Sequence, residues 1–245
     1  MKAIILCAGY AVRLYPLTLN LPKALLPIAE KPVLNYILEK IEEINEIDEI
    51  LIVTNARFYE NFLKWKETYQ NHFLKEIYLV NDLTDSNETR LGGIGDLDFA
   101  IKQEKIQEDV LIVLGDNLFD CSLKEISKFF EKTREVVIGV HDIKDLNQAK
   151  RFGVLEVKDN KVISMQEKPL EPKSSLVSTG IYIIPNEDLH FVEDYMKTGL
   201  SRDGPGNLFS YLAGKKQIFA YEIPGRWYDI GTPETYNEVN KSWSK

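Results

Sequence analysis

Two cations near the N-terminus, Arg13 and Lys23, follow a loop whose residue types suit phosphate binding. The apolar run 3–6 predicts a buried strand, and it breaks at once into a small-residue loop, 7–11. Backbone N–H groups of such a loop can point at phosphate oxygens. An arginine grips these oxygens through a planar fork, and a lysine adds a compact charge. The segment is therefore expected to receive a nucleotide, although a strand, a loop and an arginine by themselves are often only a turn.

Two carboxylates farther along the chain are candidate metal ligands. Asp116 comes shortly after the apolar run 110–114, and Asp229 lies in the sequence Trp227-Tyr228-Asp229. Magnesium prefers one or two protein carboxylates together with phosphate oxygens and water. Taken singly, however, an aspartate is more often a turn or cap residue.

The first half of the chain alternates strand-like and helix-like segments, which predicts βαβ units and a mostly parallel sheet. Ligands bind such sheets at the carboxyl ends of the strands, so the loops at Gly9 and at 115–117 are expected at one edge. The expected strands are 3–6, 49–54, 76–80, 110–114 and 136–140, and the expected helices are 33–44, 59–69, 97–103 and 123–133.

The second half has a different pattern. It predicts a hairpin with a turn at 159–160, one long strand, a helix after Asn186, a further strand, and a last helix that begins at Pro233. The most loop-like stretch, 201–207, is expected to be mobile. The strands in this half are expected at 153–157, 161–167, 176–184 and 216–223.

Composition narrows the classes of partner. The formal net charge of -8 argues against nucleic acid or an anionic membrane surface as the main partner. Cys7 and Cys121 are expected to be buried thiols, and the three histidines lack zinc-ligand spacing. Neither a signal peptide nor a run of transmembrane length is found, so a cytoplasmic protein is expected.

Seven motifs occur in an order that resembles the sugar-1-phosphate nucleotidyltransferases, over roughly residues 1–240. They are LCAGYAVRLYPLT with PK, LGGIGD, LGDN, FGVLEV, EKP, TGIY and WYDIGTPETY. The resemblance implies an α/β fold with a Rossmann-like mixed, mostly parallel sheet flanked by helices, the nucleotide-diphospho-sugar transferase fold. It also implies one domain over 1–245, with a nucleotide-binding half of about 1–140 and a sugar-binding half of about 141–245.

The same resemblance implies roles for the charged residues. Arg13 would hold the triphosphate and stabilise charge at the α-phosphate, and Lys23 would steer the attacking sugar phosphate. Asp116 and Asp229 would bind Mg²⁺, and Asp116 would also face the nucleotide. The implied reaction joins a nucleoside triphosphate to a sugar 1-phosphate and releases pyrophosphate.

Two glycine-containing segments would contact the nucleotide. The resemblance implies that Ala8, Gly9 and Tyr10 lie against the phosphates, and that Gly92 and Gly93 read the base through backbone groups. The alternative for the second segment is a glycine-rich start of the helix that follows, and both can hold.

A third group of residues would bind the sugar phosphate. In the family, residues that match Glu167 and Lys168 contact sugar hydroxyls and the sugar phosphate, and Gly153, Gly180 and Tyr182 match pieces that line the pocket. The alternatives are an ordinary solvated Glu-Lys pair, strand bulges at the glycines and core packing for the tyrosine.

The first motif contains the loop 7–11, called the signature loop below. It departs from the family pattern at Ala11 and Val12, where glycine and a hydroxyl residue usually precede the arginine. Because valine cannot donate a hydroxyl group to a phosphate, a regulatory subunit that binds nucleotide without catalysis stays open as an alternative. A cytidylyltransferase for a non-sugar phosphate such as phosphocholine is the other. The segment 87–90 lacks the glutamine of many thymidylyl enzymes, so the base is open, and a monomer or simple homo-oligomer is expected.

Overall fold

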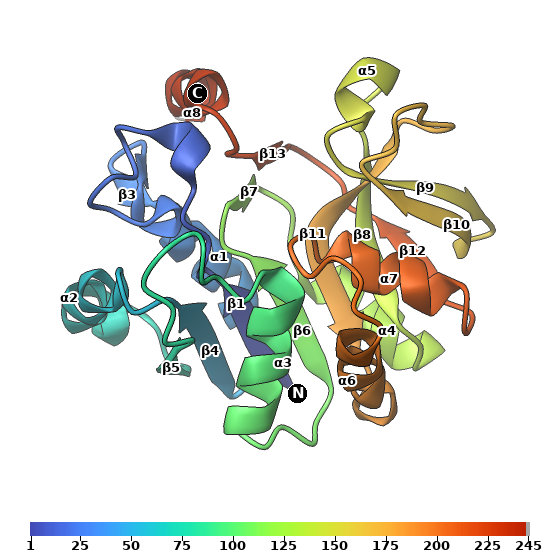
Figure 1. Ribbon diagram of the computed structural model, residues 1–245, viewed down its shortest axis with the longest axis horizontal. Helices are drawn as coiled ribbons and strands as arrows, with labels where there is room; N and C mark the ends of the chain where they lie inside the picture. The colour runs from blue at the N-terminus through green and yellow to red at the C-terminus, as the bar shows by residue number, and fades with distance from the viewer. Residues whose placement is uncertain (244–245) are drawn as a thin grey trace.

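The computed structural model describes residues 1–243, and one nine-stranded sheet runs through both halves of this part of the chain (Figure 1). The strand order is β5-β4-β1-β6-β11-β8-β12-β10-β9, and only β11 and β10 run against the others. The sheet is therefore mixed and mostly parallel, as predicted. Its strands are β1 (Lys2–Leu6), β4 (Glu49–Thr54), β5 (Glu76–Asn81), β6 (Val110–Leu114), β8 (Val137–Asp142), β9 (Gly153–Lys158), β10 (Lys161–Glu167), β11 (Leu176–Ile184) and β12 (Phe219–Glu222).

Helices cover both faces of the sheet because its central strands are apolar on both sides. In β1, Ala3 and Ile5 pack with α1, α2 and α4, whereas Ile4 packs on the opposite face with α3, α6 and α7. In Figure 1, α3 and α6 lie on the viewer's side of the sheet. The helices are α1 (Val33–Glu42), α2 (Tyr59–Tyr69), α3 (Gly93–Gln103), α4 (Lys124–Thr133), α5 (Leu146–Ala149), α6 (His190–Lys197), α7 (Gly206–Ala213) and α8 (Pro233–Ser242).

Several predicted boundaries are confirmed, and others need correction. The strands β4, β6, β10 and β11 and the helix α2 have the predicted bounds. Helix α3, however, begins at Gly93 rather than at 97, because the glycine-rich segment forms its first turn. The strand expected over 216–223 is shorter, because its pairing with β8 runs only from Phe219 to Glu222.

The segment 201–207, expected to be a loop, is partly helical. Its last two residues, Gly206 and Asn207, form the first turn of α7. The preceding backbone is tied down, because Ile94 N–H donates to the carbonyl of Arg202 at 3.0 Å. The glycines and the proline of this stretch therefore bring the chain close to α3.

Two short two-stranded sheets lie outside the main sheet and were not predicted. One pairs β2 (Pro27–Ile28) with β3 (Lys31–Pro32), and the other pairs β7 (Asn117–Phe119) with β13 (Trp227–Asp229). Strands of two or three residues are too short to give a periodic pattern. The second sheet joins the sequence motifs LGDN and WYDIG.

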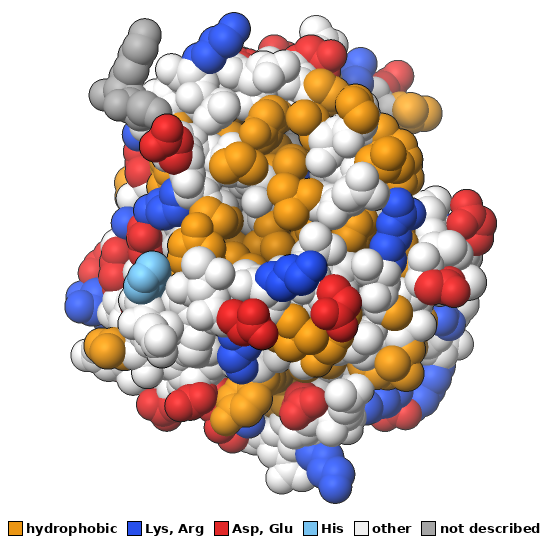
Figure 2. Space-filling view, turned by 90° about the vertical axis from the view of Figure 1, so that its left-hand side faces the viewer, with side chains coloured by type: hydrophobic (Ala, Val, Ile, Leu, Met, Phe, Trp, Pro, Cys, Tyr) orange, Lys and Arg blue, Asp and Glu red, His pale blue; other side chains and the backbone are white. Residues whose placement is uncertain are grey.

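Hydrophobic side chains gather in the upper middle part of the face drawn in Figure 2. Four apolar side chains after the signature loop are more than a third exposed: Val12, Tyr15, Leu17 and Leu19. Leu14 and Thr18 are buried, and the Thr18 hydroxyl donates to the Ala11 carbonyl at 2.8 Å.

In residues 1–243, none of the helices combines the length and the apolar composition needed to span a bilayer.

The signature loop is anchored from below by Asn55, which is fully buried at the end of β4. Its Nδ2 donates to the carbonyl of Ala8 at 2.8 Å, and its Oδ1 accepts from Phe58 N–H at 2.9 Å. One side chain thus fixes the loop to the start of the next helix. Without it, the buried Ala8 carbonyl would lose this partner, and Phe58 N–H would keep only its longer bond of 3.3 Å to the Asn55 backbone carbonyl.

We expect Asn55→Ala to lower the free energy of unfolding by about 1–3 kcal/mol, because the buried Ala8 carbonyl loses the bond from Asn55 and Phe58 N–H keeps only its longer backbone bond. Urea unfolding followed by circular dichroism measures this change. Asn61→Ala is the matched control, since the Asn61 amide bond to the Asn20 carbonyl is exposed. Equal losses in the two variants would contradict the anchoring role of Asn55.

Candidate active site

The two predicted metal ligands lie side by side because β7 and β13 pair in a defined register. Asp229 is the register partner of Asn117, which directly follows Asp116. The indole N–H of Trp227 locks this pairing, since it lies 2.9 Å from Asn117 Oδ1 and 3.1 Å from the Thr179 carbonyl oxygen. Two residues 113 positions apart in the sequence are thereby brought to one edge of the main sheet.

Lys23 holds the two carboxylates together. Its Nζ lies 2.7 Å from Asp116 Oδ2 and 3.7 Å from Asp229 Oδ1. The lysine begins a single 3₁₀ turn, 23–25, after the extended residue Pro22, and its side chain is mostly buried. Lys23 therefore contacts both candidate metal ligands.

Burial and charge oppose each other at Asp229. Burial raises the pKa of its carboxyl, and the negative charge of Asp116 raises it further. The positive charges of Lys23, Arg151 and Arg13 lower this pKa in turn. Three cations thus surround two carboxylates, which is an arrangement suited to a polyphosphate with a divalent ion.

A cavity of about 340 Å³ extends from these charges into the sugar-binding half predicted from the sequence. Glu167 ends β10 at its wall, and burial raises the pKa of this carboxyl although Lys168 opposes the shift. Lys168 Nζ lies 3.6 Å from Glu167 Oε1. Nine predicted site residues line this cavity together: Arg13, Lys23, Asp116, Gly153, Glu167, Lys168, Gly180, Tyr182 and Asp229.

Tyr182 contributes a wall of the cavity and also packs in the core. Its ring stacks on Phe209 with 3.9 Å between centroids, and its hydroxyl accepts a hydrogen bond from Ser178 at 2.8 Å. Only 3% of the residue is exposed. The core-packing alternative therefore applies to most of this side chain.

Five predicted nucleotide contacts lie outside the residues that line this cavity: Ala8, Gly9, Tyr10, Gly92 and Gly93. Tyr10 is buried and its hydroxyl pairs with Thr84, so it can offer a ligand only its backbone. Gly93 N–H donates to the Asp203 carbonyl at 3.4 Å. These five stay predictions from the resemblance.

The structure adds residues that the sequence did not single out. Arg151 and the stretch 203–206 line the cavity, and Arg90 pairs with Asp203 through two bonds of 3.1 and 3.0 Å. This stretch therefore lies between Glu167 and the segment that the resemblance assigns to the base. The position of Arg151 in the sequence could have marked it as a candidate, because it directly precedes the motif that contains Gly153.

The backbone conformation of Ala11 bears on its departure from the family pattern, in which glycine is usual at this position. This residue adopts a left-handed conformation with φ of 48°, which glycine takes at lower cost. The chain thus keeps the backbone shape of a glycine-containing loop with an alanine. The Val12 side chain is 45% exposed and offers no hydrogen bond.

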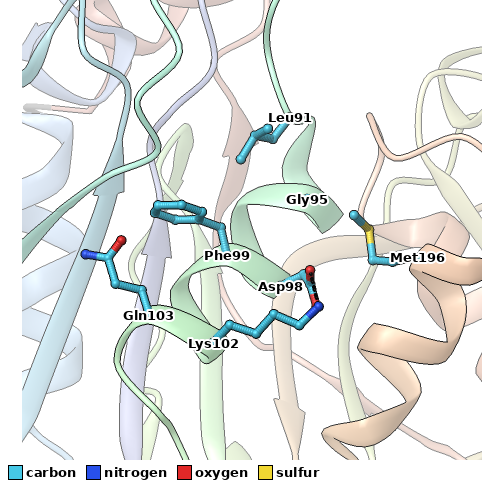
Figure 3. A pocket seen from close by; sticks show the side chains of 7 residues that line it. All are labelled: Leu91, Gly95, Asp98, Phe99, Lys102, Gln103 and Met196. Atoms are coloured by element: carbon cyan, nitrogen blue, oxygen red, sulfur yellow. Dashed lines mark hydrogen bonds and ion pairs between the residues drawn. The ribbon is translucent and has the colours of Figure 1, made fainter.

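A second hollow lies between α3 and α6 (Figure 3). It is lined mainly by apolar groups, among them Leu91, Phe99 and Met196, and the Asp98–Lys102 ion pair lies at its side. None of the predicted site residues lines it. It shares no lining residue with the cavity of the candidate active site, although Leu91 and Gly95 belong to the motif LGGIGD.

Both the backbone conformation at position 180 and the close packing around it favour glycine. Its φ is +76°, and an added Cβ would lie 2.6 Å from Asn117 Nδ2 and 2.8 Å from Leu114 Cγ. We expect Gly180→Ala to cost about 1–2 kcal/mol from the backbone and a further ~1–3 kcal/mol from overpacking. Gly199→Ala is the control, since its φ is +73° with nothing within 4 Å of the added carbon. Equal losses of unfolding free energy in the two variants would rule out the packing contribution.

The chain is similar to known proteins over almost its whole length. The sequence model of the nucleotidyl transferase family matches residues 2–245. The bifunctional protein GlmU of Methanocaldococcus jannaschii is 31% identical over 98% of this chain and 54% of its own. A bifunctional sugar-1-phosphate nucleotidylyltransferase/acetyltransferase of Sulfurisphaera tokodaii is 33% identical over 98% of this chain and 55% of its own.

This chain thus spans about half the length of these two relatives. Its fold matches that of a UDP-glucose pyrophosphorylase complexed with UDP-glucose, with a TM-score of 0.80 and 22% identity over 99% of this chain and 98% of the other. The family model, the relatives and the fold agree, and the chain belongs to the nucleotidyl transferase family.

Proposed function

We propose that this protein transfers a nucleoside monophosphate from a nucleoside triphosphate to a sugar 1-phosphate. The observation that carries the proposal is the contact of Lys23 with both Asp116 and Asp229, in a cavity that Glu167 and Lys168 also line. Cations for phosphates stand at one end, and hydrogen-bonding groups for a sugar stand at the other.

The proposed reaction needs no covalent intermediate. A phosphate oxygen of the sugar 1-phosphate is ionised at neutral pH and attacks the α-phosphorus of the triphosphate. One phosphorus–oxygen bond forms, the bond to the β-phosphate bridge breaks, and pyrophosphate leaves with the electron pair. Catalysis then consists of positioning the two phosphates and stabilising negative charge.

Arg13 and Lys23 are the residues assigned to that charge. The guanidinium of Arg13 would bind oxygens of the α-phosphate, where charge accumulates during transfer. Lys23 would reduce the electrostatic repulsion between the sugar phosphate and the triphosphate as they approach each other. Arg151 adds a third cation whose charge already acts on Asp229.

Asp116 and Asp229 fit a magnesium ion. Their carboxylates both lie within 4 Å of the same ammonium group, so they can also reach one small cation. Among residues 1–243 no set of three or more His, Cys, Asp or Glu side chains suits a metal, so phosphate oxygens and water would complete the shell. Bound Mg²⁺ would supply positive charge at the transferred phosphate.

Glu167 and Lys168 are assigned to the sugar phosphate. The Glu167 carboxyl lies at the buried end of the cavity, where it can accept hydrogen bonds from sugar hydroxyls. Lys168 is more exposed, with 57% of its side chain accessible, and can reach a phosphate that enters from solvent. The substrate panel described next determines which sugar and which base the protein uses.

The proposal predicts pyrophosphate release with Mg²⁺ for one pair of substrates. The panel crosses dTTP, UTP, CTP, GTP and ATP with glucose-, mannose- and N-acetylglucosamine-1-phosphate and with phosphocholine. Turnover with a sugar phosphate, abolished by a chelator, is the expected result. Turnover with phosphocholine alone would move the protein to the cytidylyltransferase alternative, and nucleotide binding without any turnover would indicate a regulatory subunit.

We expect Arg13→Ala to lower turnover about 10²–10³-fold, as the loss of a preorganised electrostatic donor does. Steady-state kinetics with the best substrate pair gives the value. Lys128→Ala is the control, because Lys128 is an exposed cation of α4 whose ion pair within residues 1–243 is with Glu125. Near wild-type turnover in the Arg13 variant would remove this residue from the mechanism.

A further inference from the structure

A chain of four buried polar side chains lies beneath the signature loop. The Tyr10 hydroxyl is 3.0 Å from Thr84 Oγ1, and this hydroxyl is 2.9 Å from Asp82 Oδ1. The carboxyl groups of Asp82 and Asp96 lie within hydrogen-bonding reach of each other, and these two residues are only 4% and 5% exposed. The chain thus ends in two neighbouring buried carboxyl groups.

Two carboxyl groups form a hydrogen bond only when one of them carries a proton, because a carboxylate oxygen only accepts. No N–H or hydroxyl donor reaches the buried Asp96 Oδ1 within the described part of the chain. Asp82, by contrast, accepts from the backbone N–H of Thr84 at 2.7 Å and from the Thr84 hydroxyl. Asp82 is therefore the ionised member of the pair, and Asp96 carries the proton.

The pair connects the segments that the resemblance assigns to the nucleotide. Asp82 directly follows β5, and Asp96 lies in the first turn of α3, where its N–H donates to the Gly92 carbonyl at 2.8 Å. Through Thr84, the same pair reaches Tyr10 in the signature loop. One proton thus links the base-reading segment to the phosphate-binding segment.

We propose that the proton shared by Asp82 and Asp96 holds the start of α3 in place against the signature loop, and that its loss weakens nucleotide binding. Both aspartates are positioning residues in this inference, since neither lines the cavity. The inference rests on the proposed function, because it takes these two segments as the nucleotide site.

The surroundings of the pair favour one proton at neutral pH. Burial, followed by the negative charge of Asp82, raises the pKa of Asp96 to about 8. Burial also raises the pKa of Asp82, opposed by its bonds to Thr84. The groups on the neighbouring segments are Tyr10, which faces Asp82, and the charged residues Asp85 and Arg57, which act on Tyr10.

The sign of the pH effect follows from this shift. The pKa of Asp96 in the folded protein lies above its ordinary value of 3.8, so the folded protein keeps a proton that the unfolded chain has lost. The stability contributed by this proton is fully present below about pH 4 and declines as the pH rises to about 8. Above that pH, two buried carboxylates repel each other.

Asp96→Asn tests the inference, because an amide donates to Asp82 at every pH. Calorimetric titration with Mg²⁺ and each of the five triphosphates gives Kd at pH 7 and pH 9. We expect Kd of the wild type to rise about tenfold between these values, equivalent to ~1.4 kcal/mol, and Kd of the variant to change far less. Comparing the two proteins cancels titration of the nucleotide itself.

Asp98→Asn is the matched control, because it removes a carboxylate from the same helix at the hollow of Figure 3. This variant should follow the wild type. The inference is overturned if Asp96→Asn keeps the wild-type pH dependence, or if Asp98→Asn loses it as well.

Thermal unfolding gives a second readout that needs no nucleotide. The melting temperature of the wild type relative to Asp96→Asn should fall between pH 5 and pH 8 and then level off. A difference in melting temperature that stays constant with pH would contradict the proposal that the two aspartates share a proton. If no triphosphate binds the wild type at pH 7 while this difference appears, the proposed function has failed, and with it the link to nucleotide binding.

Discussion

The ion cluster of Lys23, Asp116 and Asp229 is the interaction on which the site depends. Isolated carboxylates at this depth would be costly to ionise, and Asp229 already has a raised pKa. Lys23 offsets part of that cost, and the pairing of β7 with β13 fixes the distance between the two carboxylates. Charge and strand register therefore form one unit, since neither would position the site without the other.

The sheet explains why this cluster lies where phosphates can reach it. The parallel strands β1 and β6 are neighbours, and both end at the edge that carries the signature loop and Asp116. The antiparallel strand β11 passes next to β6 and brings Thr179 and Gly180 to the same edge. The cavity is thus built where a parallel sheet meets an antiparallel strand, and both predicted halves contribute to it.

Contacts between the halves continue on the far side of the cavity. The stretch 203–206 lies against Glu167, and its backbone and the Asp203 side chain bond to the segment that begins α3. An exposed ion pair contributes little stability by itself. The backbone bonds and the close glycine contacts give this connection its geometry. A shift of the stretch 203–206 would therefore also displace the segment that begins α3.

The sequence by itself determined the alternation of strands and helices, and with it the fold class, because buried parallel strands and amphipathic helices have distinct patterns. It also singled out Arg13, Lys23, Asp116 and Asp229 as candidate site residues, through the order of motifs and not through any one of them, and the structure places all four at one cavity. Only the tertiary structure decided that Lys23 bridges both aspartates, that Arg151 joins them, and that Asp82 lies beside Asp96. These contacts join residues far apart in the chain, and their geometry follows from strand pairing and packing, which leave no periodic signal in the sequence.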